Sequence, residues 1–147
     1  MNVINISSAI IADEYGRILL LHRSDDQYTH WELPGAIVDD EQQAEDDETT
    51  EQACLRGLYN ALEVRAKIGA ELGSSQIEVG DNLYHYHWFQ VTVVMGELTI
   101  ADSDTYDDLD YFDIEDMPSL AMSDDVLELY PKLYSGDIVV QSGGSDV

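Results

Sequence analysis

The feature that most restricts the fold of this chain is a change of pattern at Thr50. From there apolar side chains recur at spacings of three and four, which predicts an amphipathic helix with Thr49 or Thr50 as its N-cap. The segments before and after it have the composition and turn signals of strands. The apolar face of the predicted helix consists of Cys54, Leu55, Leu58, Ala61 and Leu62.

The remaining elements are predicted to be mainly strands. Two of them surround a turn and predict an opening hairpin, and "SDDVLELYPKLY" predicts a closing helix with Ser123 as its N-cap. A chain of 147 residues with this pattern favours a single α/β or α+β domain over residues 1–138, followed by a flexible polar tail at 139–147. The predicted strands lie in 3–12, 17–23, 64–72, 82–100 and the first part of 107–120, which then leads into a short helical piece.

Charge restricts the partners of the protein. The chain has 31 acidic and 6 basic residues, a formal net charge of -25. Repulsion of this size opposes compaction at low ionic strength, and the balance is similar to that of proteins from salt-accumulating halophiles. An acidic interaction surface or a cation-binding protein are the alternatives. Because the acidic residues run along the whole chain, a solvated acidic surface is favoured, and nucleic acids and anionic membranes are unsuitable partners.

Targeting signals are not apparent at the start of the chain. No basic segment is followed there by an apolar one, and no apolar run approaches the ~18 residues of a membrane span. We therefore expect a soluble cytoplasmic protein.

Several landmarks occur in a familiar order. "ILLLHR" is followed by "WELPG", an acidic loop, "ACLRGLYNALEV" and, late in the chain, "DYFDIEDMP". In this layout the chain resembles the Nudix hydrolase family over roughly residues 3 to 135. The resemblance implies an α/β/α sandwich around a central mixed sheet, and an activity that cleaves a nucleoside diphosphate linked to another moiety with Mg²⁺ or Mn²⁺.

The resemblance breaks down at the residues that carry the family's chemistry. The family helix typically reads like "AALRELYEELGV", which places Arg56 at the motif arginine. Gly57 replaces the first motif glutamate, Asn60 and Ala61 replace the paired glutamates, and Glu63 replaces the glycine. Glutamates at these three positions would share one helical face and hold divalent ions there, whereas this face offers one amide and no carboxylate. Restoring all three glutamates should therefore restore affinity for divalent metals.

The loop before the helix allows two alignments. Gly35 and Glu41 have the family's spacing of five intervening residues, but Glu48 lies eight positions before Arg56, with the seven intervening residues that the motif requires. We prefer Glu48, because the helix is the better-defined end. Glu48 and Glu51 are then the candidate catalytic or metal-binding residues, and Arg56 and Gly35 are candidate ligand-binding residues; Arg56 in a plain surface ion pair is the alternative.

Gly57 has two interpretations of its own. A glycine inside a helix costs about 1 kcal/mol relative to alanine. It indicates either a close contact between the helix and a strand, or relaxed selection at a lost metal site.

Other residues are weaker candidates. Arg17 and Arg23 share a face of the second predicted strand and are candidates for a ligand phosphate, with charge balancing as the alternative. Trp31 is a candidate to stack on a base, with core packing as the alternative. His85 and His87 point to the same side of a strand, as a zinc pair would, although an acidic sheet face with histidines is favoured.

Three functions are compatible with these features. The first is a Nudix-like domain with weakened or lost hydrolysis that binds a nucleoside diphosphate-type ligand or a protein partner. The second is an active Mg²⁺- or Mn²⁺-dependent hydrolase that uses carboxylates of the acidic loop. The third is a structural subunit of a homodimer or larger assembly, which would have neither ligand nor turnover.

Overall fold

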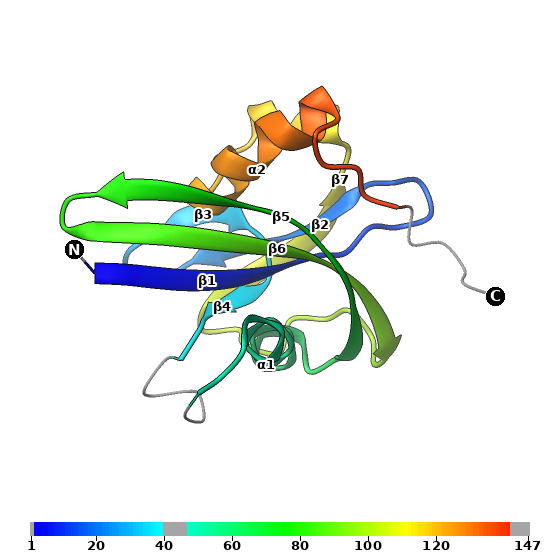
Figure 1. The fold of residues 1–147 in the computed structure, drawn as a ribbon. Helices are drawn as coiled ribbons and strands as arrows, with labels where there is room; N and C mark the ends of the chain where they lie inside the picture. The colour runs from blue at the N-terminus through cyan, green and yellow to red at the C-terminus, as the bar shows by residue number, and fades with distance from the viewer. Residues whose placement is uncertain (1, 40–46, 142–147) are drawn as a thin grey trace.

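The computed structural model describes residues 2–39 and 47–141, and its strands form two sheets (Figure 1). In the first sheet β1 runs parallel to β6 and antiparallel to β4, and β5 pairs with β6 in a long hairpin. The order is β4 (Gly35–Ile37), β1 (Asn2–Ile10), β6 (Asn82–Met95), β5 (Arg65–Val79). The second sheet is antiparallel, with the order β3 (Thr29–Glu32), β2 (Ile18–Ser24), β7 (Tyr106–Phe112).

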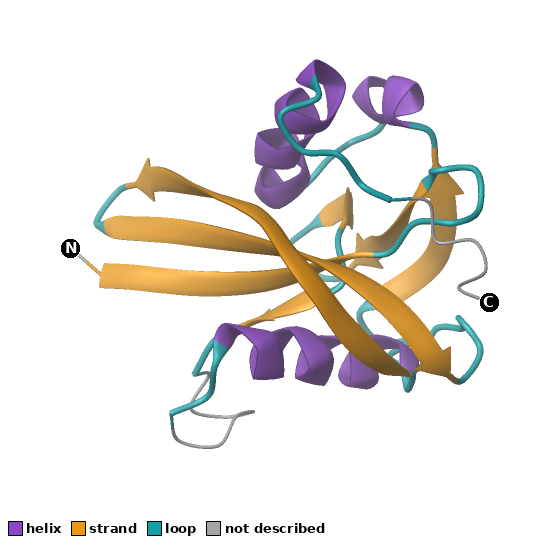
Figure 2. Cartoon of the chain, turned by 45° about the vertical axis from the view of Figure 1, so that its right-hand side comes forward, coloured by secondary structure: helices purple, strands orange, loops and turns teal. Residues whose placement is uncertain are grey.

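Helices cover both sides of these sheets. Helix α1 (Thr50–Leu62) lies on one side, and the 3₁₀ helix Ile114–Ser119 and α2 (Asp124–Ser135) lie on the other (Figure 2). The predicted mixed sandwich in a single domain is confirmed, with the strands divided between two sheets. No helix in residues 2–39 and 47–141 has the length and apolar character needed to cross a membrane.

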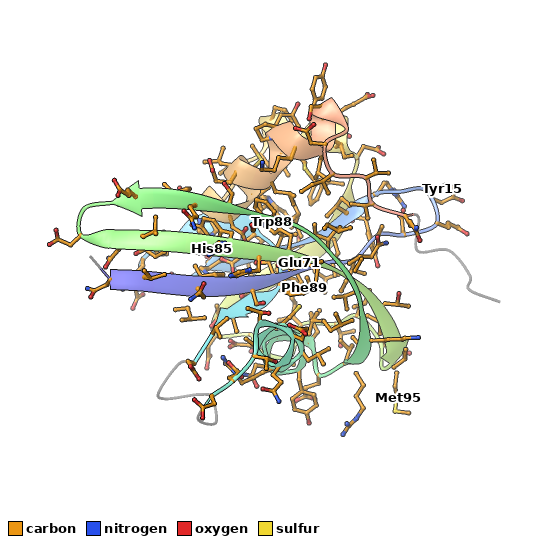
Figure 3. The ribbon with its side chains drawn as sticks, in the orientation of Figure 1. Tyr15, Glu71, His85, Trp88, Phe89 and Met95 are labelled. Atoms are coloured by element: carbon orange, nitrogen blue, oxygen red, sulfur yellow. The ribbon has the colours of Figure 1, made fainter. Side chains whose placement is uncertain are left out.

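Two hydrophobic cores lie between the strands and the helices, and side chains of both contribute to each core. Neighbouring residues of β1 alternate between them: Ala9 packs with the α1 core and Ile10 with the α2 core. Strand β6 does the same, because Trp88 points toward α2 and Phe89 toward α1 (Figure 3). The period of two in a strand thus anchors one helix to each face.

The predicted opening hairpin is wrong beyond its turn. The two strands exist, but they meet only at Ala12 and Ile18 and then separate into different sheets. The competing interaction is the parallel pairing of β1 with β6 along nine residue pairs, from Asn2 with Asn82 to Ile10 with Gln90. A turn signal identifies the turn but carries no information about such a distant strand.

Strands β5 and β6 also differ from their predicted bounds. β5 continues to Val79, well past Leu72, because most of its length pairs with β6. β6 ends at Met95, since Gly96 adopts φ +105°, a left-handed conformation that breaks the strand. Residues 97–100, predicted to be strand, are not in one.

The helix termini agree with the sequence prediction. Thr49 caps α1 in a reciprocal pair with Gln52, and Ser123 accepts a hydrogen bond from the Val126 amide at the start of α2. The expected tail begins with three described residues, 139–141, and Gln141 exchanges two hydrogen bonds with Gln90 of β6. Residues 142–147 lie outside the described part of the chain.

Helix α1 approaches the first sheet through two glycines. A Cβ on Gly57 would lie closer than 3.0 Å to the Cα, carbonyl carbon and carbonyl oxygen of Gly35 in β4. A Cβ on Gly35 would in turn overlap the carbonyl oxygen of Ser7 in β1. Both glycines are therefore needed for close packing, which is the helix-strand alternative considered for Gly57.

We predict that Gly57→Ala destabilises the protein. Helix propensity alone would favour alanine, but the Cβ meets backbone that cannot rotate away, so we expect a net loss of roughly 1 to 2 kcal/mol. Thermal unfolding in multimolar KCl measures it. Asn60→Ala is the control, since residue 60 is exposed on the same helix and should lose nothing. A Gly57→Ala variant as stable as Asn60→Ala would contradict the predicted contact.

Candidate functional site

A cavity of about 700 Å³ lies between α1, strands β1, β3 and β4, the loop before β7 and the first turn of α2. This volume is in the range of small-molecule sites. The two close glycines, Gly35 and Gly57, form part of its wall together with Asn60 and Ala61. The helix face at which the family resemblance implies metal ligands therefore does face this cavity.

An arginine network forms one side of the cavity. Arg23 of β2 donates two hydrogen bonds to Glu32 of β3, at 2.6 and 3.0 Å, and one to Asp25 at 2.8 Å. Its Nη2 also donates to the Tyr106 hydroxyl at 3.2 Å, and that hydroxyl donates to Glu32 at 2.8 Å. The Nε2 of His30 lies 2.8 Å from the same carboxylate. Arg23 is thus held by the protein's own acceptors.

The hydrogen bonds of this network shift the pKa values of its acidic members. Burial alone would raise the pKa of Glu32, but the hydrogen bonds and charge of Arg23, together with the hydrogen bonds from His30 and Tyr106, hold it below its usual value. The hydrogen bond from Arg23 also lowers the pKa of Asp25 to about 2. Burial raises the pKa of the Tyr106 hydroxyl, and the nearby Glu32 charge adds to the effect. Glu32 is therefore ionised and Tyr106 neutral at neutral pH.

A buried carboxyl group, Asp125, lies at another side of the cavity. The Nε1–H of Trp88 donates to its Oδ1 at 2.6 Å, and the Ser8 hydroxyl donates to its Oδ2 at 2.5 Å. Burial raises the pKa of Asp125 to about 6, although both hydrogen bonds oppose the increase. This carboxyl is positioned by the protein and remains able to accept hydrogen bonds, because each carboxylate has about four acceptor positions.

Arg56 and Glu48 form an ion pair at the rim. Arg56 donates to both carboxylate oxygens of Glu48, at 2.8 and 3.0 Å, and to the carbonyl oxygen of Ile37 at 2.7 Å. Glu48 also exchanges two hydrogen bonds with Asp39. This pair has the spacing that the sequence alignment preferred; Glu41, the other choice, lies outside the described residues.

The other residues that the sequence marked as candidates do not line the cavity. Glu48 and Glu51 do not line it; the side chain of Glu48 is only 6% exposed beside Arg56, and that of Glu51 accepts a hydrogen bond from Thr50. Arg17 pairs with Asp13 in the first turn, at 2.7 Å, and does not join Arg23. Trp31 packs against Phe112, with ring centroids 4.8 Å apart, so it follows the core-packing alternative. Of the predicted ligand-binding residues, Arg23, Arg56 and Gly35 line the cavity.

The histidine pair on β6 lies outside the cavity. The rings of His85 and His87 are 4.1 Å apart on one side of the strand, as the alternation predicts. His87 contacts Asn5 and Glu71, at 3.1 and 3.2 Å. Within residues 2–39 and 47–141, no group of three or more His, Cys, Asp or Glu side chains is arranged to hold a metal ion.

Several residues of the cavity were not predicted from the sequence. Asp102 and Tyr106 come from the loop before β7 and from its first residue, where no motif marks them. Asp125 did leave a signal: it occupies the inward-facing position of α2, four and eight residues before the buried Leu129 and Leu133. An acidic residue on the apolar face of a helix is a candidate for a buried site.

Comparisons with known proteins agree with the fold and the landmarks. A family model for the NUDIX domain matches residues 4–133. The CTP pyrophosphohydrolase of Escherichia coli strain K12 is 35% identical over 100 residues, which are 67% of this chain and 69% of the relative. This chain belongs to the Nudix family and is related to pyrophosphohydrolases.

Solved structures are similar over nearly the whole chain. The solution structure of the E. coli ORF135 protein has a TM-score of 0.75 and 26% identity, covering 92% of this chain and 91% of that one. The crystal structure of a MutT protein from Methanosarcina mazei Go1 also has a TM-score of 0.75, with 17% identity and coverage of 92% and 96%. The second similarity concerns the fold alone.

We predict that Asp125→Asn changes the pH dependence of stability. Because the folded-state pKa of Asp125, about 6, exceeds its ordinary value of 3.8, the folded protein retains a proton that the unfolded chain releases. The free energy of unfolding of the native protein therefore falls as pH rises from 3.8 to about 6. Above this range Asp125 is ionised in the folded protein, and the destabilisation is complete. Relative to the native protein, the Asp125→Asn variant should gain on the order of 2 kcal/mol between pH 4 and pH 7.

Denaturant unfolding of both proteins across this pH range measures the difference. Asp124→Asn is the control, since residue 124 is exposed and the same charge is removed. A stability difference for Asp125→Asn that stays constant with pH would show that Asp125 titrates normally.

Proposed function

We propose that this chain is a Nudix domain in which hydrolysis is weakened or lost, and which binds a nucleotide-type ligand in the cavity between β4, α1 and α2. The observation that carries the proposal is the contact between Gly57 and Gly35. The position of the first motif glutamate has no room for any side chain, because the backbone of β4 occupies that space. The ligand set for Mg²⁺ or Mn²⁺ therefore does not fit this helix.

This contact changes the test suggested by the sequence. Glutamates at positions 57, 60 and 61 together would displace β4 as well as add carboxylates, since the Cβ of residue 57 alone meets Gly35. A failure of that variant to bind metal would therefore say nothing about the alignment.

The alternative of an active hydrolase has less support. Glu48 is committed to Arg56 and Asp39, and Glu51 lies outside the cavity. The other loop carboxylates, in residues 40–46, lie outside the described part of the chain.

Binding of a nucleotide-type ligand is supported by the cavity and by the relatives. The cavity combines aromatic side chains with hydrogen-bonding groups held in place, as small-molecule sites do. The similar E. coli protein is, by its name, a pyrophosphohydrolase that acts on CTP. A domain that keeps this cavity without the metal ligands is suited to binding without turnover.

The test is incubation of the protein with nucleoside di- and triphosphates in multimolar KCl, with Mg²⁺ or Mn²⁺, and product analysis by mass spectrometry. We expect no cleavage above a protein-free control, while binding of a nucleoside or nucleotide is detected with the same folded sample. Cleavage that survives repurification and is lost in Glu48→Gln or Glu51→Gln would overturn the proposal in favour of the acidic-loop hydrolase.

We also infer that the protein is adapted to high salt. Its net charge is -25, and three arginines are already paired with acidic side chains in the fold. Most carboxylates thus repel one another without a cationic partner, and salt screens this repulsion.

We therefore predict that the unfolding temperature rises steeply from millimolar to multimolar KCl. Circular dichroism during heating measures the midpoint at each concentration. NaCl at equal ionic strength is the control for a specific effect of potassium, and a midpoint independent of salt would contradict the inference.

A further inference from the structure

The arginines that line the cavity already bind acceptor groups of the protein. Among the six lysines and arginines of the chain, only Arg23 and Arg56 line it. Arg23 donates to Glu32, Asp25 and Tyr106, and Arg56 donates to Glu48 and to a backbone carbonyl. Both guanidinium groups are engaged in charge-assisted hydrogen bonds within the protein, so a ligand phosphate would have to compete for their charge with carboxylates already in contact.

Three carboxyl groups of the cavity are not paired with an arginine or lysine in the described part of the chain. Asp102, Asp124 and Asp125 line it, and none of them forms an ion pair with an arginine or lysine in residues 2–39 and 47–141. The segments outside these ranges contain no lysine or arginine, so they cannot supply one. The cavity therefore carries an excess of negative charge, which its walls concentrate.

A phosphate chain is poorly suited to this environment. Nudix chemistry on such a chain depends on divalent cations to offset its charge, and the face formed by Gly57, Asn60 and Ala61 provides no carboxylate to hold them. The same carboxyl groups do suit a ligand that donates hydrogen bonds. Asp125 in particular is held by Ser8 and Trp88 with acceptor positions to spare, and Tyr28, Tyr86 and Tyr106 add aromatic surface.

We infer that the cavity binds a neutral or cationic nucleoside, and discriminates against the same nucleoside carrying a di- or triphosphate. This inference rests on the proposed function and specifies its ligand class. The two guanidinium groups act as structural cations, and the uncompensated carboxyl groups act as the selecting element.

The experiment is a calorimetric titration of the full chain with two matched series: cytidine, CMP, CDP and CTP, and adenosine, AMP, ADP and ATP. Each is measured in molar KCl with and without Mg²⁺. In at least one series we expect the nucleoside to bind, and affinity to fall by about tenfold or more between the nucleoside and its triphosphate. The difference should shrink as KCl increases, because salt screens the repulsion.

A charge-matched pair of variants isolates the cause. Asp102→Asn/Asp124→Asn removes two carboxylates from the cavity and should raise the affinity for the triphosphate relative to that for its nucleoside. Asp110→Asn/Asp137→Asn removes the same charge from exposed positions that do not line the cavity, and should leave the ratio unchanged.

The outcomes distinguish this inference from the proposed function. A triphosphate that binds as tightly as its nucleoside without being cleaved, or nucleotides that bind while no nucleoside does, overturns the inference alone. Cleavage of the triphosphate overturns the proposed function instead. An equal effect of both double variants would assign the discrimination to net charge and also contradict the inference.

Discussion

Helix α1, strand β4 and strand β1 are stacked through positions without side chains, and the arrangement of the site depends on this stack. Gly57 lies on the backbone of Gly35, and Gly35 lies on the carbonyl group of Ser7. Two adjacent serines of β1 also join this strand to both helices. Ser7 donates a hydrogen bond to the Thr50 carbonyl at the start of α1, and Ser8 donates one to Asp125 at the start of α2. One strand therefore positions both helices around the cavity through hydrogen bonds from two adjacent serines.

Scarce positive charge is used mainly for structure. Arg17 closes the first turn with Asp13, Arg23 joins β2 to β3 through Glu32, and Arg56 joins α1 to the segment before it through Glu48. The two last pairs are partly buried, so loss of one partner would leave a poorly solvated charge.

Periodicity and capping residues were sufficient to predict both helices, and the order of landmarks was sufficient to predict the family fold. The sequence could not predict that β1 and β2 belong to different sheets, because that depends on pairing between residues 80 positions apart. Of the candidate site residues that it proposed, Arg23, Arg56 and Gly35 line the cavity, whereas Glu48, Glu51, Arg17 and Trp31 do not. Asp102 and Asp125 acquire significance only when the loop before β7 and the first turn of α2 meet α1 across the cavity. Whether Gly57 reflected packing or lost function was undecidable from one sequence, since the answer lies in the backbone of β4.

Strand β5 has a further consequence for the protein in concentrated salt. It is a 15-residue edge strand, and its outer side pairs with no other strand in the described residues. Long edges invite pairing between copies, and screening by salt removes the charge repulsion that would otherwise keep copies apart. The register shifts around Glu71 and Gly73 interrupt this edge with irregular backbone. Because an irregular edge is a poor template at any ionic strength, it gives the protein a defence against polymerisation that remains when its electrostatic defence has been screened away.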